Sequence, residues 1–538
     1  MKNKIVLFLL FVFLVIFLMI QAGCNLSGTE NNSTTVTTKG SNGIKLPIGM
    51  NIAELNYYTP QVIFTDVMTT ASPYRTPEWG YLADGDINLD ENGYPIGLPQ
   101  TRKSDGKSTY IRFLVNDYYK GKYRILYQGK GTLGGNVTLE NSKYYITLDG
   151  LGEHKWIDIL TSDPTDYIRS IKILPIEYEN GEPYPTFLKK FLDGLRTFHA
   201  LRFMDSSRIN FSIQVNWSDR VTKTYYTQGG DKGVSFDYAI DLCNEIDADA
   251  WVCVPHKATD DYIRNMAKLW RDNLKSGKKI YLEFSNETWN WSFSQSQYIV
   301  NNAPDAVDVY VSQDLAAIGT AGINHPEKDA YMMARCFKIW GEEFSGSPTR
   351  LVKVATGQHA WVDNSRRILE YLFKVAKVPC DAFAIGGYFS FTEEDHNNWL
   401  TSTPSPEKIC EDTLARFATT SELWTKQSAA YAAQYGVDFL VYEGGQHMQP
   451  YQQQVWSYND NLYEAQINPK IYDLYIKNFS IHTDASVDCK LFIAWNYIGT
   501  RKSKYGSWGH LESLDQVGGN YSIIAPKFQA LLDCNTPK

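Results

Sequence analysis

The sequence has little positive charge in any one place. Its 538 residues include 52 lysines and arginines against 60 aspartates and glutamates, which gives a formal net charge of −8. Basic residues occur only singly or in isolated pairs such as Arg366–Arg367. Because nucleic-acid backbones are bound through a basic face, we expect no nucleic-acid partner. We expect the chain to be a monomer.

The sequence also lacks the motifs that are typical of metal sites, cofactor sites and disulfide frameworks. Eight cysteines include Cys24, and the remaining seven form no C-x-x-C pair, which argues against a disulfide framework and against a zinc site. There is no H-E-x-x-H motif, no glycine-rich phosphate loop between a strand and a helix, and no G-x-S-x-G elbow. We therefore expect buried free thiols, no metal and no cofactor.

A long hydrophobic run occurs at the N-terminus. Two lysines precede an unbroken apolar stretch from Ile5 to Ile20, which is shorter than the ~20 residues that a membrane-spanning helix needs. A short basic region followed by such a stretch is typical of an export signal. We expect residues 1–23 to be a signal peptide, and a plain membrane anchor is the alternative.

The sequence Ala22-Gly23-Cys24 resembles a bacterial lipobox, although Gln21 stands where leucine is usual. The resemblance implies that Cys24 is lipidated and becomes the mature N-terminus. Residues 24–43 are polar and low in complexity, as a tether would be. We expect an exported lipoprotein, anchored at the outer surface of the bacterial cell envelope.

Aromatic residues are abundant. They make up 14% of the chain, with 36 tyrosines and 14 tryptophans, more than a core normally requires. Amphipathic rings in excess suggest exposed stacking platforms, and the flat faces of sugars are common partners for such platforms. A tyrosine-rich β module would account for part of the excess.

Short apolar strands alternate with amphipathic helices from about residue 181 onward. Nearly all-apolar strands, each followed by a helix, indicate a parallel sheet covered on its outer face. Seven such strands are visible, and an eighth lies upstream in residues 44–55, so we predict an α/β fold of the (β/α)8 TIM barrel type. The seven strand segments are residues 199–205, 248–256, 279–287, 350–359, 380–389, 437–445 and 489–497.

A different pattern interrupts the barrel after its first strand. Residues 82–180 contain short segments with period-two alternation, separated by turn signals, which is typical of an antiparallel β-sandwich. We predict an inserted β-sandwich there, possibly a carbohydrate-binding module. Residues 44–81 would hold the first barrel strand and the following segment, and residues 181–538 the remainder of the barrel. A separate N-terminal domain with a complete barrel downstream is the alternative.

Two carboxylates end apolar strands of the predicted barrel. Glu287 ends the segment that begins at Tyr281 and follows Asn286 directly, while Glu443 ends the strand in residues 437–445. The C-terminal ends of barrel strands face a common cleft. Two carboxylates in one cleft are the groups that glycoside hydrolysis requires, one protonated as the acid and the other ionised.

With these features the sequence resembles clan A of the glycoside hydrolases, family 5 or a related family. In that clan the acid/base glutamate follows an asparagine at the end of strand four, and the nucleophile ends strand seven. Counting strands from residues 44–55 places Asn286–Glu287 on the fourth and Glu443 on the seventh. Thr288 departs from the pattern, because family 5 enzymes commonly carry proline there.

The resemblance also implies roles for residues at other strand ends. Arg202 would support the nucleophile and favour its charged form, while desolvation would keep Glu287 protonated. Asn286 would bond the sugar 2-hydroxyl. Glu283, four residues before Glu287, should lie deeper in the barrel, paired with a cation. His256 would be a histidine in the cleft, Tyr388 would donate a hydrogen bond to the nucleophile, and Trp495 would form the floor of a sugar subsite. The candidates for the groove walls are Trp289, Trp291 and Trp508.

The expected function is therefore that of a retaining glycoside hydrolase that cleaves a β-linked polysaccharide internally, such as cellulose, xylan, mannan or mixed β-glucan. Glu287 would be the acid/base and Glu443 the nucleophile of a double displacement. One alternative is an exo-acting β-xylosidase or arabinofuranosidase on the same scaffold. Another is a non-catalytic, glycan-binding surface lipoprotein. The sugar itself depends on loops whose shape the sequence does not specify.

Overall fold

A computed structural model describes residues 43–303 and 325–538. The predicted signal peptide, most of the predicted tether and the predicted lipidation site Cys24 lie outside these residues. No helix in the described part of the chain is long and apolar enough to cross a membrane.

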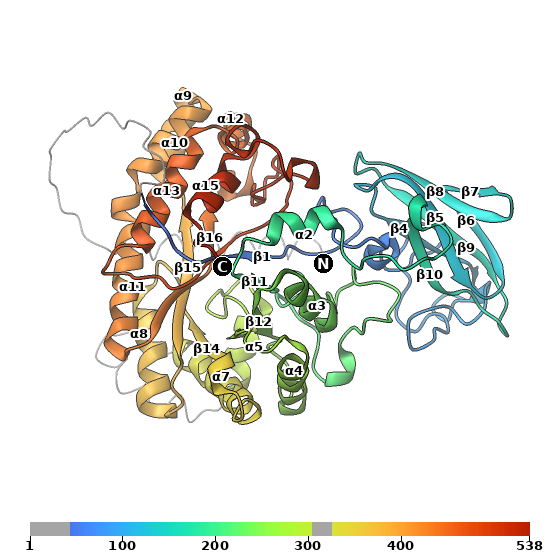
Figure 1. Ribbon diagram of the computed structural model, residues 1–538, viewed down its shortest axis with the longest axis horizontal. Helices are drawn as coiled ribbons and strands as arrows, with labels where there is room; N and C mark the ends of the chain where they lie inside the picture. Colours follow the sequence, from blue (N-terminus) through green and yellow to red (C-terminus); the bar gives the residue numbers. More distant parts are fainter. Residues whose placement is uncertain (1–42, 304–324) are drawn as a thin grey trace.

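The larger part of the molecule is a closed barrel of eight parallel strands (Figure 1). The first strand pairs with both the second and the last, which closes the ring. The predicted TIM barrel is therefore confirmed, including the strand taken from residues 44–55. The strands, in order around the ring, are β1 (Ile48–Asn51), β11 (Ala200–Arg202), β12 (Asp249–Val254), β13 (Ile280–Phe284), β14 (Leu351–Thr356), β15 (Ala382–Phe389), β16 (Asp438–Gln446) and β17 (Phe492–Ala494).

Helices surround the barrel and cover its outer face (Figure 1). Several begin at a capping side chain: Thr259, for example, accepts a hydrogen bond from the backbone N–H of Tyr262, satisfying one of the free donors at a helix start. The helices are α2 (Lys189–Leu195), α3 (Phe236–Ile246), α4 (Asp260–Asn273), α5 (Ser294–Asn302), α7 (His325–Glu343), α8 (Val362–Glu370), α9 (Glu393–Ser402), α10 (Pro406–Ala415), α11 (Ser421–Tyr435), α12 (Asn459–Ala465), α13 (Lys470–His482), α14 (Tyr521–Ile524) and α15 (Pro526–Cys534).

The barrel has two distinct hydrophobic layers. Alternate strand residues such as Leu440 and Tyr442 belong to a cluster inside the ring. Their neighbours Phe439 and Val441 belong to the cluster shared with the helices. This alternation is the period-two pattern of a strand, and it explains why the strands are apolar on both faces.

The chain between β1 and β11 forms an antiparallel β module beside the barrel (Figure 1). One sheet has the strand order β10-β5-β8-β7, a second has the order β4-β9-β6, and β2 and β3 form a small two-stranded sheet. Because β1 belongs to the closed barrel, the module is an insertion and not a preceding domain. Its strands are β2 (Gln100–Thr101), β3 (Ser108–Thr109), β4 (Ile111–Val115), β5 (Lys120–Gln128), β6 (Gly131–Gly135), β7 (Val137–Glu140), β8 (Lys143–Asp149), β9 (Lys155–Ser162) and β10 (Arg169–Pro175).

The module and the barrel share a packed junction. The rings of Tyr74 and Tyr226 stack with their centroids 4.2 Å apart, and Phe64 packs against Tyr238 of α3 at 4.8 Å. The backbone N–H of Ser72 donates to the carbonyl of Leu114 in β4 at 2.8 Å. Residues before position 82 thus take part in the structure of the module.

The cysteines of the described residues are free and buried, as predicted. Burial raises the pKa of the Cys336 and Cys410 thiols to about 12, so they remain neutral and unreactive near neutral pH. The seven cysteines are Cys243, Cys253, Cys336, Cys380, Cys410, Cys489 and Cys534.

Candidate active site

The segment after β13 turns sharply before it presents Glu287. Ser285 has φ +57° and Glu287 has φ +40°, both in the left-handed region that residues other than glycine rarely adopt. Such conformations cost about 1–3 kcal/mol each and tend to occur at functional sites. The turn leaves the Glu287 side chain half-buried, and its Oε2 accepts a hydrogen bond from the Asn290 amide at 3.0 Å.

A bulge in β16 directs Glu443 to the same centre. Strict alternation after Tyr442, which faces the barrel interior, would turn Glu443 outward. The register between β15 and β16 shifts at this point: Ile385 pairs with Val441, but Gly386 pairs with Glu443. Bulges of this kind redirect a side chain, and Glu443 is brought to the barrel mouth with only 5% of its surface exposed.

Two glycines after Glu443 permit this local geometry. A side chain at Gly444 would place its Cβ 2.7 Å from the carbonyl oxygen of Gly387 on the neighbouring strand. Gly445 has φ +132°, which strongly favours glycine. The Glu-Gly-Gly sequence is thus a requirement of the backbone as well as of the chemistry.

Arg202, at the end of β11, joins the residues of the site. Its Nη1 donates to Glu443 Oε2 at 2.8 Å, and its Nη2 donates to Asn286 Oδ1 at 2.7 Å. The remaining guanidinium donors form a two-point contact with Glu283, with both distances at 3.0 Å. Arg202 is fully buried, so its position is set by these three partners.

Glu283 lies below the cleft and holds Arg202 in place. It is fully buried and also accepts hydrogen bonds from Trp251 Nε1 at 2.7 Å and from the Cys253 thiol at 3.2 Å. A buried charge needs such a complete set of partners, because desolvation is costly. The prediction that this glutamate pairs with a cation deep in the barrel is confirmed.

The electrostatics of the two mouth carboxyls differ. Burial raises the pKa of Glu287 to about 8, and the nearby charge of Glu443 acts in the same direction. Burial also raises the pKa of Glu443, but Arg202 and the Tyr388 hydroxyl oppose this rise. Arg202 therefore favours the charged form of Glu443, as expected, but its effect is smaller than that of burial.

Asn286 is oriented on both sides of its amide. Its Oδ1 accepts from Arg202, and its Nδ2 donates to Asn210 Oδ1 at 3.0 Å. Gln295 of α5 supports the turn by donating to the same Asn210 oxygen at 2.7 Å and to the Asn286 carbonyl at 3.0 Å. The residue before Glu287 is thus rigidly held beside the Arg202 guanidinium.

Aromatic side chains surround the second carboxylate. The Tyr388 hydroxyl at the end of β15 donates to Glu443 Oε1 at 3.1 Å. Trp508 packs against Tyr388 with a ring separation of 6.0 Å, and His447 lies 5.1 Å from Trp508. Trp495 follows β17 and packs on the cluster inside the barrel.

The tryptophans after Glu287 have different environments. Trp289 is half-buried, and its indole N–H has no hydrogen-bond partner among the described residues. Trp291 is 37% exposed and lies 4.5 Å from the ring of His325. Their contact with a substrate stays a prediction.

His256 follows β12 and is completely buried. Burial lowers the pKa of its imidazole to about 4, so the ring is neutral at ordinary pH. Neither ring nitrogen has a protein partner within the described part of the chain. Its nearest aromatic neighbour is Tyr298, at 5.3 Å.

Sequence reasoning missed an acidic group beside Glu443. Asp205 lies three residues after Arg202, and Glu54 lies three residues after the end of β1. Burial raises the pKa of Asp205 to about 8, and the charges of Glu443 and Glu54 add to this rise. The first two barrel strands are short, so Glu54 and Asp205 lie just beyond the strand ends. Acidic residues at such positions were the signal that could have identified them.

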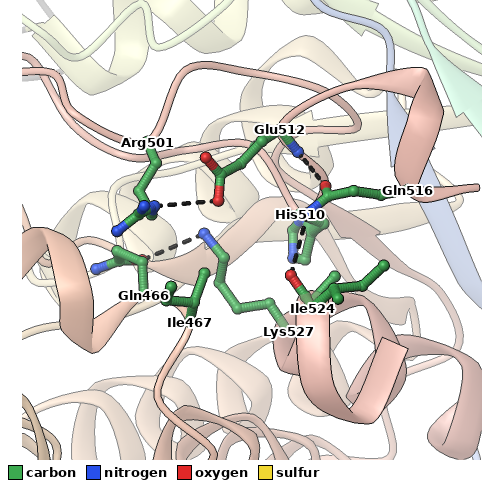
Figure 2. Close-up of a pocket in the computed structure, with 10 residues that line it drawn as sticks. Gln466, Ile467, Arg501, His510, Glu512, Gln516, Ile524 and Lys527 are labelled. Carbon is green, nitrogen blue, oxygen red and sulfur yellow. Dashed lines mark hydrogen bonds and ion pairs between the residues drawn. The ribbon is translucent and has the colours of Figure 1, made fainter. Parts of the chain in front are cut away.

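A second polar hollow lies under the loop after β17. Figure 2 shows Lys527 pointing towards Gln466, with Arg501 and Glu512 alongside. Lys527 Nζ donates to Gln466 Oε1 at 3.2 Å and to the Ser507 carbonyl at 2.9 Å. Ser507 precedes Trp508, so Lys527 stabilises the loop that carries this predicted groove wall. Neither Glu287 nor Glu443 lines the hollow.

The described residues contain no group of three or more histidine, cysteine or acidic side chains arranged to hold a metal ion. The site thus offers two carboxyls, one guanidinium, amides and rings. Such a set can exchange protons and attack an electrophilic carbon.

No protein-family model matches the sequence, and no curated protein matches it. Solved structures do resemble it. An arabinofuranosidase of family 51 from Xanthomonas axonopodis pv. citri is 13% identical, with a TM-score of 0.38, over 60% of this chain and 62% of that chain. The chain spans about three fifths of the length of the family 51 arabinofuranosidases that it resembles.

Two other similar structures are polysaccharide-cleaving enzymes. An endo-β-1,4-mannanase of family 26 from Cellulomonas fimi is 9% identical, with a TM-score of 0.34, over 63% of this chain and 65% of its own. A family 5 xyloglucanase from Bacteroides ovatus is 9% identical, with a TM-score of 0.34, over 85% of this chain and 100% of its own. These structural neighbours are clan A glycoside hydrolases. At these identities and TM-scores the likeness carries no argument about what this chain does.

Proposed function

We propose that the protein is a retaining glycoside hydrolase that cleaves a β-linked polysaccharide. One observation carries this proposal: two carboxyls lie at one barrel mouth with opposite sets of partners. Glu443 is held by a guanidinium and a tyrosine hydroxyl, whereas Glu287 is held protonated by burial and by the charge of Glu443. Retaining hydrolysis requires one carboxylate nucleophile and one carboxylic acid.

In the first step Glu443 attacks the anomeric carbon of the bound sugar. The glycosidic C–O bond breaks, and Glu287 donates its proton to the departing oxygen. Arg202 and Tyr388 keep the carboxylate oriented for attack, since they contact different oxygens of Glu443. The products are a glycosyl ester on Glu443 and a shortened chain with a free hydroxyl.

In the second step water releases the sugar. Once Glu443 is esterified, it no longer carries the negative charge that raises the Glu287 pKa, so Glu287 ionises more readily. It then removes a proton from the attacking water while the ester bond breaks. The anomeric configuration is inverted twice and therefore retained.

A polymer substrate cleaved internally agrees with the rings around the mouth. Trp508 packs against Tyr388, which contacts Glu443, and Trp291 follows Glu287 and is partly open to solvent. Asn286, which accepts a hydrogen bond from Arg202, would bind a hydroxyl of the sugar that is cleaved.

The test is incubation with soluble mixed-linkage β-glucan, arabinoxylan, galactomannan and xyloglucan, with sizing of the products and NMR of the first anomer formed. Oligosaccharides that appear first in the β configuration would support the proposal. Monosaccharides alone would indicate exo action, a first-formed α anomer would exclude retention, and intact polymers would favour a glycan-binding protein.

We also propose that Cys24 carries a lipid anchor at the cell surface. The support is the apolar N-terminal run that ends in Ala22-Gly23-Cys24. A Cys24→Ser protein with its signal removed should leave the detergent phase and enter the aqueous phase. Detergent partitioning equal to that of the wild type would exclude the anchor.

A further inference from the structure

A row of exposed and half-buried rings leads from the barrel mouth onto the β module. It begins at Glu54, which follows β1 and lies close enough to Asp205 for its charge to add to that of Glu443. Glu54 accepts a hydrogen bond from the Tyr58 hydroxyl at 3.1 Å. Tyr58 is 51% exposed, so the edge of the catalytic centre opens directly onto an accessible ring.

The next rings are joined by Arg75. Tyr57 packs edge-on against Tyr58 with the ring centroids 5.0 Å apart, and its hydroxyl accepts a hydrogen bond from Arg75 Nη2 at 3.2 Å. The same guanidinium lies 4.1 Å from the centroid of the Tyr81 ring and donates to the carbonyl of Trp79 at 3.1 Å. Arg75 thus contacts the Tyr57 hydroxyl, the Tyr81 ring and the backbone of Trp79.

The row ends over strands β4 and β9 of the module. Trp79 lies edge-on to Trp156 with a separation of 5.2 Å, and the Arg112 guanidinium lies 4.1 Å from the centroid of the Trp79 ring. Asp158 holds that guanidinium through two hydrogen bonds, at 2.7 and 3.0 Å. Cation–π contacts of this kind fix the orientation of a ring, so Trp79 is held in place although it is 45% exposed.

These features are unusual for surface aromatics that only pack. Tyr81 is 64% exposed, and Trp79 has φ +71°, a strained backbone conformation that keeps it on the surface. Ordered, exposed rings match the needs of a sugar chain, which offers apolar faces for stacking.

We propose that this aromatic track (Tyr57, Tyr58, Trp79, Tyr81 and Trp156) binds the distal part of the same β-linked glycan chain that occupies the barrel mouth. The inference rests on the proposed function for the identity of the ligand. Contacts run without a break from Glu54 to Trp156, and we therefore assign the track to the substrate chain and not to a separate ligand. The inserted β module would thereby extend the groove instead of binding a separate glycan.

Binding is tested first without hydrolysis, in a Glu443→Gln background. Affinity electrophoresis in gels that contain mixed-linkage β-glucan, arabinoxylan, galactomannan or xyloglucan measures retention of the full chain. Adding Trp79→Ala and Tyr81→Ala should weaken retention by the best polymer about tenfold, the size expected for two ring contacts. The matched control is Leu139→Ala, because Leu139 is 62% exposed on β7 in the other sheet.

Tyr81→Ala alone serves as the second variant, since its exposed ring can be removed with little risk to folding. Weaker retention of both track variants, with the Leu139 control unchanged, supports the track. Retention equal to that of the parent, equal loss in the control, or no retention by any of the four polymers overturns it.

Kinetics separates this inference from the proposed function. In the active protein, Trp79→Ala/Tyr81→Ala should raise KM about tenfold on the polymer and leave kcat/KM unchanged on a short aryl β-glycoside. An equal loss on both substrates would overturn the track but leave the hydrolase intact. A wild type that retains polymers through the track and hydrolyses none would overturn the proposed function alone.

Discussion

The barrel and the β module use buried charge in different places. In the barrel, a guanidinium and a carboxylate lie at the very centre: Arg202 and Glu283 are both fully buried. In the module, the centre is formed by apolar side chains such as Ile125 and Ile157, and the buried Arg112–Asp158 pair lies under a surface ring. The barrel therefore places its buried charge at its core, whereas the module places its buried ion pair directly beneath a surface ring.

The physical reason is topology. Parallel strands all end at one mouth, so polar residues at the strand ends converge and must neutralise each other. Antiparallel strands alternate in direction and present polar residues on one face. Under the proposed function the barrel would perform the chemistry and the module would supply a binding surface, and the following changes test this division.

The largest effect is expected for Glu443→Gln. Loss of the nucleophile should reduce kcat/KM on every substrate by more than about 10³-fold, as removal of a member of a catalytic unit does. Initial rates on a polymer and on an aryl β-glycoside measure it. Glu245→Gln at the end of α3 is the control and should have wild-type activity; an active Glu443→Gln protein would exclude the proposed nucleophile.

A selective loss is expected for Glu287→Ala. Poor leaving groups need the acid, so polymer hydrolysis should fall about 10²–10⁴-fold, whereas the first step on activated aryl glycosides should persist. Azide should then intercept the glycosyl ester and yield a β-glycosyl azide, which NMR identifies. The absence of any azide product, with polymer activity undiminished, would contradict the acid/base role.

Stability should respond more strongly in the barrel than in the module. Arg202→Met leaves Glu283 and Glu443 buried without their cation, so the free energy of unfolding should fall by about 3–5 kcal/mol. Arg112→Met leaves one carboxylate close to the module surface, and its cost should be smaller. Urea midpoints measure both, and an equal or larger loss in Arg112→Met would break the comparison.

The pH profile should reflect the raised pKa of Glu287. Only the protonated acid donates to the leaving group, so kcat/KM on a polymer should decline as the pH rises through about 8. Ionisation of Glu443, whose pKa is also raised, should set the acidic limb. For Glu287→Ala acting on an activated glycoside, the alkaline limb should disappear; an unchanged limb would assign it to another group.

The last effect concerns stability against pH. The folded-state pKa of Glu287, about 8, lies above its ordinary value of 4.5, so the folded protein binds this proton more tightly than the unfolded chain. The resulting stability is present below about pH 4.5 and is lost as the pH rises towards 8. Glu287→Gln should therefore lose less stability than the wild type between pH 5 and 8, as measured by urea unfolding.

Much of the architecture could be predicted from the sequence because it depends on local patterns. The alternation of apolar strands and helices indicated the barrel, and the strand ends pointed to Glu287 and Glu443. Glu283 could be distinguished from Glu287 by its position along the strand, because it comes four residues earlier and therefore lies deeper in the ring. The short strands β1 and β11 carried too little pattern for Asp205 and Glu54 to be noticed.

The sequence by itself determined which residues lie at strand ends, because the periods of strands and helices are local properties of the chain. Only the tertiary structure decided how those ends meet. The bulge that directs Glu443 inward arises from the register with β15, and burial at the barrel mouth shifts both carboxyl pKa values. The aromatic track likewise joins Tyr57, Trp79 and Trp156, which are distant in sequence and are brought together by packing of the inserted module against the barrel.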